Sequence, residues 1–371
     1  MRKVLQISNY YTPHIGGIES TCQYLSEGLS DEYEVRVLCF SEDKNDKIEV
    51  INGIKVFKAG VIFNIARQGL SFSYLGILRE QMKWKPDIIH FHYPNPFVTA
   101  LLLPLIPKEI KLFLHWHLDI TKQKKIYPFI RKLEVALLKR ANIIVTTSPN
   151  YKFSSKPLAP FLDKTEILPS AIDLSKFDLN NDDVHIIDEI KKKANGRKIV
   201  LYVGRHVPHK GVGILIDAEP MIDKNCIIFV GGNGPITEES KAKCHSDRVF
   251  FLGRMSEQNM RCYYHAADIF AFPSYTKAEA FGLTLIEAMY CGAVPVTFTI
   301  WGSGVNWVSL KDKTCLEVPN LDVKAYADAI NKLVSDDNLR CELSINGKHR
   351  VIEYFSVEAE VRLLKSQYKT L

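Results

Sequence analysis

Short apolar runs rich in β-branched residues alternate along the chain with longer segments of mixed character. In the first half these runs predict seven strands, over Val4–Ser8, Val35–Phe40, Lys55–Ala59, Asp87–His92, Lys111–His115, Ile143–Thr147 and Glu166–Leu168. Helical patterns lie between several of them, most clearly over Ser20–Ser30 and Tyr127–Arg140. This alternation is typical of a doubly wound parallel sheet, so we expect an α/β fold.

The pattern changes near the middle of the chain. Ser175–Gly196 is polar and charged, and it predicts an interdomain connection with a short helix. A second strand–helix series runs from Lys198 to about Leu333, and Asp336–Leu371 has a helical pattern. Because 371 residues exceed what one core usually supports, we predict two domains, 1–173 and 197–355, joined by a linker over 174–196.

Composition adds little that is unusual. The chain is 46% hydrophobic and 24% charged, which is ordinary for a globular protein. Its longest apolar segment, Phe97–Pro107, is too short and too interrupted by proline for a transmembrane helix, and the N-terminus leads straight into a strand without a signal-peptide pattern. The eight cysteines show no C-x-x-C spacing, so we expect reduced core residues of a cytosolic protein.

The segment EAFGLTLIE, from Glu279 to Glu287, is the most informative stretch of the sequence. Glu287 lies in an apolar run that predicts a helix over Leu283–Tyr290, and Gly282 stands at the junction before it. A helix start offers unpaired N–H groups and a partial positive charge. The segment therefore combines a site for phosphate with two carboxylates suited to sugar or ribose hydroxyls.

A second motif, GRHVPHKG at 204–211, follows the predicted buried strand Lys198–Val203. Its first glycine lets the backbone approach a ligand, and Arg205 and Lys210 offer a guanidinium fork and a point charge for phosphate oxygens. A third glycine-rich loop, GGNGP at 231–235, ends another apolar run. Each motif alone also fits a solvated surface loop, but together they indicate a phosphate-binding site.

The ordered set of motifs resembles the retaining GT-B glycosyltransferases of family 4, which use nucleotide sugars. The resemblance covers nearly the whole chain and also rests on PHIGGIE at 13–19, HWHLD at 115–119, TSP at 147–149 and LPSAID at 168–173. It implies two doubly wound Rossmann-like domains facing an interdomain cleft. It further implies that a C-terminal helix, about 356–371, returns to the first domain, and that the second domain binds the nucleotide sugar.

The resemblance also assigns roles to residues. Arg205 and Lys210 would stabilise the departing diphosphate, Glu279 would contact the donor sugar, and Glu287 would hold the ribose hydroxyls. Gly16 and Gly17 would leave room for phosphate and acceptor. The other donor-binding candidates are Gly204, Asn233, Gly234, Ala280, Phe281, Gly282 and Leu283.

Two predicted strands end in histidine pairs, His90 with His92 and His115 with His117. Strand ends of this kind border the ligand crevice, although a histidine there is often structural. The pattern His-x-Asp before a basic stretch resembles the family's histidine near the sugar and assigns that role to His117. His115 remains the alternative, because a shift of two positions along a strand keeps the same face.

Other classes fit less well. A dinucleotide oxidoreductase needs G-x-G-x-x-G, but Thr237 stands where the third glycine belongs. The resemblance implies transfer with net retention. Because the Asp-x-Asp motif of metal-dependent transferases is absent, we expect this transfer to need no metal and no cofactor other than the nucleotide-sugar co-substrate. An epimerase or phosphorylase of the same fold, or a non-catalytic nucleotide-sugar-binding protein, are the alternatives.

The substrates follow only from resemblance. WGSGVNWV at 301–308 and HLDITKQK at 117–124 are most similar to bacterial surface-polysaccharide transferases, several of which are mannosyltransferases. GDP-mannose is therefore the favoured donor and a lipid-linked oligosaccharide the expected acceptor. A UDP-hexose or UDP-N-acetylhexosamine is the alternative donor, since nothing in the sequence separates guanine from uracil.

Charge is unevenly distributed. Residues 1–170 carry 23 Lys and Arg against 16 Asp and Glu, whereas the rest is almost neutral. The excess concentrates in Lys122–Arg140, where aromatic residues interleave with cations. Such a segment suits an anionic membrane surface or a solvated helix face, and no motif indicates nucleic-acid binding. We predict a cytoplasmic protein that binds reversibly to the inner face of the cell membrane.

Overall fold

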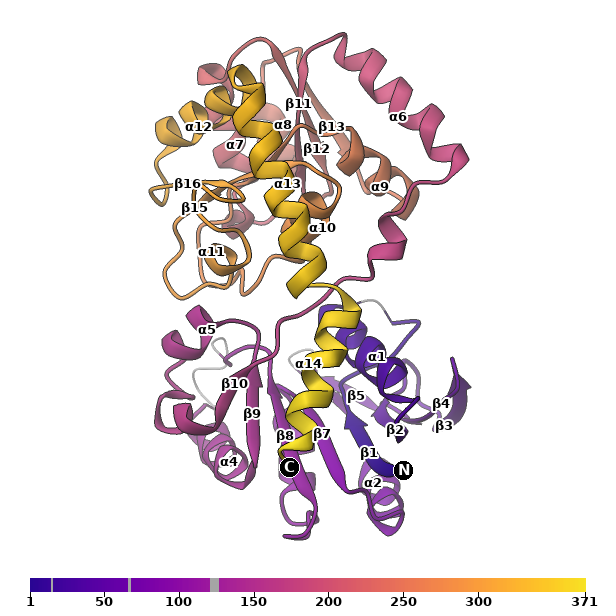
Figure 1. Cartoon of the computed structure of the whole chain (residues 1–371). Coiled ribbons are helices and arrows are strands. Elements are labelled where there is room, and N and C mark those ends of the chain that lie inside the picture. Colours follow the sequence, from indigo (N-terminus) through magenta and orange to yellow (C-terminus); the bar gives the residue numbers. More distant parts are fainter. Residues whose placement is uncertain (15, 66–67, 121–126) are drawn as a thin grey trace. The chain divides into compact units, whose positions relative to one another are not determined.

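The computed structural model describes residues 1–14, 16–65, 68–120 and 127–371 (Figure 1). The chain divides into two compact units. Unit 1 comprises Met1–Ser170 and Val357–Leu371, and unit 2 comprises Ala171–Ser356. Each unit is a Rossmann-like α/β domain built on its own sheet, which confirms the predicted fold class.

Unit 1 contains an eight-stranded sheet in the order β10-β9-β8-β7-β1-β2-β4-β3. Its strands are β1 (Arg2–Ile7), β2 (Tyr33–Phe40), β3 (Lys47–Ile51), β4 (Ile54–Ala59), β7 (Ile88–Tyr93), β8 (Lys111–Trp116), β9 (Ile143–Thr146) and β10 (Thr165–Ile167). All neighbouring strands are parallel except β3, which pairs antiparallel with β4 at the edge. A separate hairpin pairs β5 (Phe63–Ile65) with β6 (Gln68–Leu70).

Six α-helices accompany the described part of this sheet: α1 (Gly17–Leu29), α2 (Tyr74–Lys83), α3 (Pro96–Leu102), α4 (Tyr127–Arg140), α5 (Pro149–Ser154) and α14 (Val357–Lys369), with a 3₁₀ turn η1 (Ala159–Lys164). All seven strands predicted in this half are present. The sequence did not predict β3, because the strand lies at the edge and most of its side chains are exposed or half-buried, without a buried face.

Unit 2 contains a six-stranded parallel sheet in the order β13-β12-β11-β14-β15-β16. The strands are β11 (Lys198–Val203), β12 (Cys226–Gly231), β13 (Val249–Gly253), β14 (Ile269–Phe272), β15 (Val294–Phe298) and β16 (Leu316–Val318). Its α-helices are α6 (Asn181–Ala194), α7 (Val212–Ala218), α8 (Thr237–Lys243), α9 (Glu257–Ala266), α10 (Leu283–Tyr290), α11 (Val305–Val308), α12 (Val323–Ser335) and α13 (Asp337–Tyr354). Three 3₁₀ turns complete the unit: η2 (Leu174–Phe177), η3 (Pro208–Lys210) and η4 (Glu219–Met221).

The central strands are largely buried because helices cover both faces of each sheet, and they are apolar except for a few buried polar residues of unit 1. Every residue of β12 and β14 is buried. In both sheets the strand order reverses beside the first strand, between β1 and β7 in unit 1 and between β11 and β14 in unit 2. Loops that leave such a reversal in opposite directions open a crevice at the carboxyl ends of the strands.

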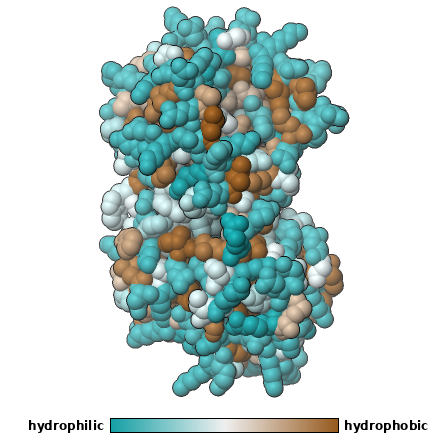
Figure 2. Space-filling view, viewed as in Figure 1, coloured by the Kyte–Doolittle hydropathy of each residue, from teal (hydrophilic) through white to brown (hydrophobic). Residues whose placement is uncertain are grey.

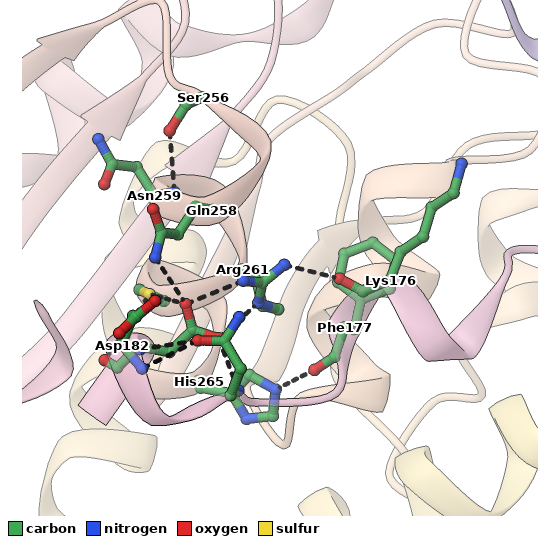
Figure 3. Close-up of polar contacts among 11 residues, drawn as sticks. Lys176, Phe177, Asp182, Ser256, Gln258, Asn259, Arg261 and His265 are labelled. Atoms are coloured by element: carbon green, nitrogen blue, oxygen red, sulfur yellow. Dashed lines mark hydrogen bonds and ion pairs between the residues drawn. The ribbon is translucent and has the colours of Figure 1, made fainter.

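The segment 174–196 does not form the separate linker that its polarity predicts. It forms η2 and α6, and Phe177, Ile187 and Ile190 lie in the core of unit 2. Asp183 on α6 is buried and accepts hydrogen bonds from Nε and Nη2 of Arg261 on α9, at 2.8 and 2.9 Å. Figure 3 labels Arg261 and draws its polar contacts as dashed lines. Segment 174–196 therefore belongs to unit 2, and the polar residues that suggested a linker cover the exposed face of α6.

The C-terminal helix α14 belongs to unit 1. Val361, Leu364 and Tyr368 lie in the same buried cluster as residues of β1, β2 and α1. Gly28 on α1 allows this close packing, because a Cβ added there would meet the side chain of Val361. The last residues of the chain thus complete a core that begins with its first strand.

The surface in the view of Figure 2 is largely hydrophilic over both units, with separate apolar areas. Among the described residues, no helix combines the length and the apolar character that spanning a membrane requires.

Candidate functional site

The predicted phosphate and sugar residues of unit 2 meet at the point where the strand order reverses. The loop after β11 carries Arg205 and Lys210, and the loop after β14 carries Glu279. The ammonium of Lys210 forms an ion pair with the Glu279 carboxylate, in which the two side chains retain 24% and 9% exposure. Two motifs that lie about seventy residues apart in the sequence are therefore joined directly.

Three further groups hold Glu279 in place. Ser274 donates a hydrogen bond to its carboxylate over 3.3 Å, and Ser303 donates to its backbone oxygen. The next residue, Ala280, accepts a backbone hydrogen bond from Gly304 at 2.8 Å. The Trp301–Val308 segment, singled out in the sequence, thus supports the loop that carries Glu279.

The glycine loops after β11 and β12 pack backbone against backbone. The amide of Gly204 donates to Gly231, and that of His206 donates to Asn233. Gly232 has φ = +106°, and a Cβ there would collide with the carbonyl oxygen of Gly204. Only glycine satisfies both the backbone conformation and the contact.

These loops line a cavity of about 480 Å³ next to the exposed side chain of Arg205. Its described lining consists of Val203, Gly204, Arg205, Gly232, Asn233, Gly234, Pro235, Arg254, Met255 and Met260. A lining that combines glycine backbones, two arginines and two methionine side chains suits a partly polar ligand. Of the predicted residues, Gly204, Arg205, Asn233 and Gly234 line this cavity, whereas Lys210 and Glu279 do not.

Helix α10 begins as predicted, at Leu283 directly after Gly282. Gly282 has φ = +93°, a backbone conformation that residues with a side chain rarely adopt. Phe281 is buried in the core of unit 2, so its side chain supports the loop from within. The helix start therefore presents backbone N–H groups beside the loop of Glu279.

Glu287 lies on α10, one turn further than the helix start. Tyr264 on α9 donates a hydrogen bond to its carboxylate at 2.8 Å. Burial raises the pKa of Glu287, while the hydrogen bond from Tyr264 and the charge of Lys210 act in the opposite direction. Lys210 thus acts electrostatically on both predicted carboxylates.

In unit 1, Gly16 precedes α1 and accepts the first helical hydrogen bond, from Ser20. Its backbone is extended, with φ = −176°, a conformation open to any residue. A Cβ at Gly16 would meet only the flexible carboxylate of Glu19. Gly17 is the first residue of α1, so both glycines lie at a helix start, where unpaired N–H groups can bind an anion.

The two histidine pairs form one buried cluster on neighbouring strands β7 and β8. His90 and His92 stack at a centroid distance of 4.5 Å, and His115 and His117 stack at 3.9 Å. Burial lowers the pKa of His117 to about 3 and those of the other three well below the usual range. All four imidazoles are therefore neutral at physiological pH.

Imidazole nitrogens of His90, His92 and His115 lie within 4.8 Å of one another, a spacing that a metal ion would accept. Hydrogen bonds already account for most of these nitrogens. His90 bonds to Tyr368 and to His115, and His92 bonds to His117 and Gln6. Only Nε2 of His115 has no partner among the described residues. The arrangement is that of a hydrogen-bonded core cluster.

Several residues of the site carry no signal in the sequence. Tyr264, Ser274 and Ser303 contact the two glutamates, and Arg254 and Met255 complete the cavity. Ser303 lies in the Trp301–Val308 segment, but nothing in that segment indicated a contact with Glu279. The other residues belong to no motif, and Tyr264 has the pattern of an ordinary core residue of α9. Their roles follow from which strand ends and helices lie together in the folded unit.

Comparison with known families covers both units. Residues 15–176 match the family described as Glycosyltransferase Family 4, and residues 183–350 match the one described as Glycosyl transferases group 1. The chain is a GT-B glycosyltransferase.

This glycosyltransferase is similar over its full length to named enzymes. It is 28% identical to O-antigen chain mannosyltransferase C of Escherichia coli, covering 100% of this chain and 99% of that protein. It is 26% identical to the D-rhamnosyltransferase WbpZ of Pseudomonas aeruginosa, covering 96% and 92%.

Solved structures share the fold of the glycosyltransferase at lower identity. Sucrose-phosphate synthase from Thermosynechococcus elongatus has a TM-score of 0.77 at 22% identity and covers 100% of this chain and 99% of its own. The HepE protein of Anabaena, solved in complex with UDP, has a TM-score of 0.78 at 17% identity with full coverage of both chains.

The neutral histidine cluster predicts that acid destabilises the glycosyltransferase. An unfolded histidine takes up a proton below about pH 6.5, whereas the folded cluster resists it. The contribution of the cluster to the free energy of unfolding is therefore constant above pH 6.5, and it falls as the pH drops from 6.5 towards 3. Each histidine of the cluster contributes about 1.4 kcal/mol per pH unit to this fall. Urea unfolding at pH 7.5, 6.0 and 5.0 measures the slope.

Two histidine variants separate this effect from general acid sensitivity. His115→Asn removes one buried imidazole whose Nε2 has no partner among the described residues, and should reduce the slope by about one histidine's share. His185→Asn, at an exposed position of α6, should leave the slope unchanged. A slope in His115→Asn equal to that of the wild type would contradict the assignment.

Proposed function

We propose that the glycosyltransferase moves a hexose, with mannose from GDP-mannose favoured, onto a lipid-linked oligosaccharide in the synthesis of a surface polysaccharide. The observation that carries the donor part is the Lys210–Glu279 ion pair at the strand-order reversal, together with a cavity lined by Arg205 from the same loop as Lys210. Similarity to an O-antigen mannosyltransferase supports the sugar and the pathway. The transfer proceeds with net retention at the anomeric carbon.

Catalysis in this proposal is electrostatic stabilisation of the leaving group. Negative charge develops on the departing diphosphate, and preorganised cations and N–H groups aimed at it lower the barrier. Arg205 and Lys210 supply the cations, and the start of α10 supplies N–H groups. Removal of one such donor typically costs about 2.7–4 kcal/mol of activation free energy.

In this proposal Lys210 has one partner when the site is empty, Glu279, and another when the donor is bound, its diphosphate. Without a phosphate, Glu279 compensates the partly buried charge of Lys210, which would otherwise be costly. A diphosphate offers Lys210 a stronger anionic partner, so the Glu279 carboxylate is released towards the sugar hydroxyls. Glu287, held by Tyr264 through one oxygen, keeps its other oxygen for the ribose hydroxyls. His117 helps to stabilise the oxocarbenium-like state of the sugar.

Lys210→Ala and Arg205→Ala should each lower turnover at least tenfold, because each removes a cation from the leaving phosphate. Initial rates with GDP-mannose, measured by GDP release, provide the readout, and a panel with UDP-hexoses and UDP-N-acetylhexosamines identifies the donor. Lys224→Ala, an exposed lysine away from both motifs, is the matched control and should retain wild-type turnover. Near-native turnover in either test variant removes that residue from the catalytic role.

We expect a chelator to leave activity unchanged, because cationic side chains take the place that a divalent ion holds in Asp-x-Asp transferases. The measurement is turnover in EDTA, then with added Mn²⁺ or Mg²⁺. Activity that disappears in EDTA and returns with either ion would overturn this part of the mechanism.

The membrane part of the proposal concerns Lys122–Arg140 at the inner face of the cell membrane. Lys122, Lys124 and Lys125 lie outside the described residues. In the described part, Phe129 on α4 is 74% exposed and Lys132 is exposed, as an interfacial helix requires. Arg131 pairs instead with buried Glu134 at 3.6 Å, so its loss would leave a buried carboxylate without its cation.

Replacing four lysines of this segment by glutamate should abolish binding to anionic vesicles at low salt. The positions are Lys122, Lys124, Lys125 and Lys132, and Arg131 is left intact for the reason above. Each basic residue near an anionic surface contributes about 1 kcal/mol, screened over about 8 Å at physiological salt. Binding should therefore be reversible and salt-sensitive, which cosedimentation at two salt concentrations measures.

The matched control reverses four exposed lysines of unit 2 and should still cosediment: Lys191, Lys192, Lys224 and Lys313. Equal loss of binding in both variants would indicate a response to net charge alone. If the wild-type protein does not bind the vesicles at low salt, the segment is a solvated helix face and not a membrane-binding one.

A further inference from the structure

A hydrogen-bonded chain inside unit 1 ends at His117. Nε2 of His117 lies 3.0 Å from Nδ1 of His92, and Nε2 of His92 lies 3.0 Å from Oε1 of Gln6. Gln6 and His92 are fully buried, and His117 is 7% exposed. The chain runs from β1 across β7 to the residue directly after β8, so three neighbouring strands determine its geometry.

The acceptor at the buried end decides where the protons lie. The Gln6 amide is oriented with Oε1 towards His92, and its Nε2 has no partner among the described residues. In this orientation the carbonyl oxygen can only accept, so Nε2 of His92 carries a hydrogen. A neutral imidazole has one N–H, which makes Nδ1 of His92 an acceptor. Nε2 of His117 must then be the donor in the second hydrogen bond. Nδ1 of His117 is left with its lone pair and has no partner among the residues that the structure describes.

Packing prevents the rings from turning away from this arrangement. His92 stacks on His117 at a centroid distance of 5.3 Å and on His90 at 4.5 Å, and His115 stacks on His117 at 3.9 Å. Burial keeps the rings neutral, since it lowers the pKa of His92 well below the usual range and that of His117 to about 3. Each ring therefore has a fixed plane and a single N–H.

We propose that Gln6 and His92 are positioning residues that hold His117 as its Nε2–H tautomer, with Nδ1 as a hydrogen-bond acceptor. The proposal rests on the proposed function, in which His117 acts at the reacting sugar. An acceptor nitrogen suits a sugar hydroxyl, which donates its O–H, whereas the opposite tautomer would present an N–H to the sugar. Through His92, the buried Gln6 amide thus determines that His117 accepts a hydrogen bond from a sugar hydroxyl and does not donate one to a sugar oxygen.

The tautomer can be measured without substrate, on the full-length protein. Long-range ¹H–¹⁵N correlation spectra of the imidazole rings distinguish a protonated from an unprotonated ring nitrogen, and the spectrum of His117→Gln assigns the signal of His117. We expect Nε2 of His117 to be protonated and Nδ1 to be unprotonated. A wild-type spectrum with the proton on Nδ1 overturns the proposal.

Gln6→Met removes the acceptor while nearly preserving side-chain volume. The His117 signal should then show both tautomers, and kcat should fall roughly tenfold, as is common for residues that orient a functional imidazole, with little change in the KM for the donor. Gln81→Met is the matched control: Gln81 is 2% exposed on α2 and outside the cluster, so its loss should change neither tautomer nor kcat. An unchanged His117 signal in Gln6→Met contradicts the positioning role.

The outcomes separate this proposal from the proposed function. If Gln6→Met does not fold, the wild-type spectrum still decides the tautomer. If His117→Gln keeps full turnover while the wild type shows the Nε2–H form, the role of His117 at the sugar fails and the positioning by Gln6 and His92 stands.

Discussion

The candidate site of unit 2 depends on the reversal of strand order beside β11. Loops that follow β11 and β14 leave the sheet in opposite directions, so their first residues remain close while the chains diverge. Arg205 and Lys210 come from one loop and Glu279 from the other. The sheet thus brings together a cationic and an anionic motif that share no local sequence context. The glycines through which the loops after β11 and β12 contact each other also line the cavity that Arg205 borders.

In the absence of a ligand, the charge of Lys210 is compensated by the acidic residues around it. Lys210 pairs with Glu279. Burial raises the pKa of Glu287, and the hydrogen bond from Tyr264 and the charge of Lys210 offset part of that rise. A cation paired with a carboxylate is compensated while no ligand is bound. In the proposed function, a phosphate of the donor replaces that carboxylate as the partner of Lys210.

Unit 1 differs from unit 2 in that polar imidazole rings are buried within its sheet. Four histidines lie on adjacent strands, and burial of their charged forms would be costly. The rings remain neutral and form two hydrogen-bonded pairs, His90 with His115 and His92 with His117. The first pair bonds to Tyr368 of α14 and the second to Gln6 of β1. The C-terminal helix is thus part of the polar core as well as of the apolar one.

Much of the fold could be predicted from the sequence because parallel strands covered on both faces must be apolar runs, and such runs are visible locally. The motifs at their ends located Arg205, Lys210, Glu279 and the start of α10 for the same reason, since a strand end and a helix start have characteristic residues. Where local polarity was the only guide, the prediction of a linker over 174–196 was wrong, because the buried contacts of α6 come from α9.

The sequence by itself therefore determined the elements, their order and the chemistry at their ends. Only the tertiary structure decided which of these groups meet. Tyr264 reaches Glu287, and Gln6 reaches His92 across 86 positions of the chain. Such pairs leave no periodic pattern, because the contact depends on the order of strands in the sheet and on helix packing. Charge compensation at Lys210 and the proposed tautomer of His117 depend on tertiary contacts for the same physical reason.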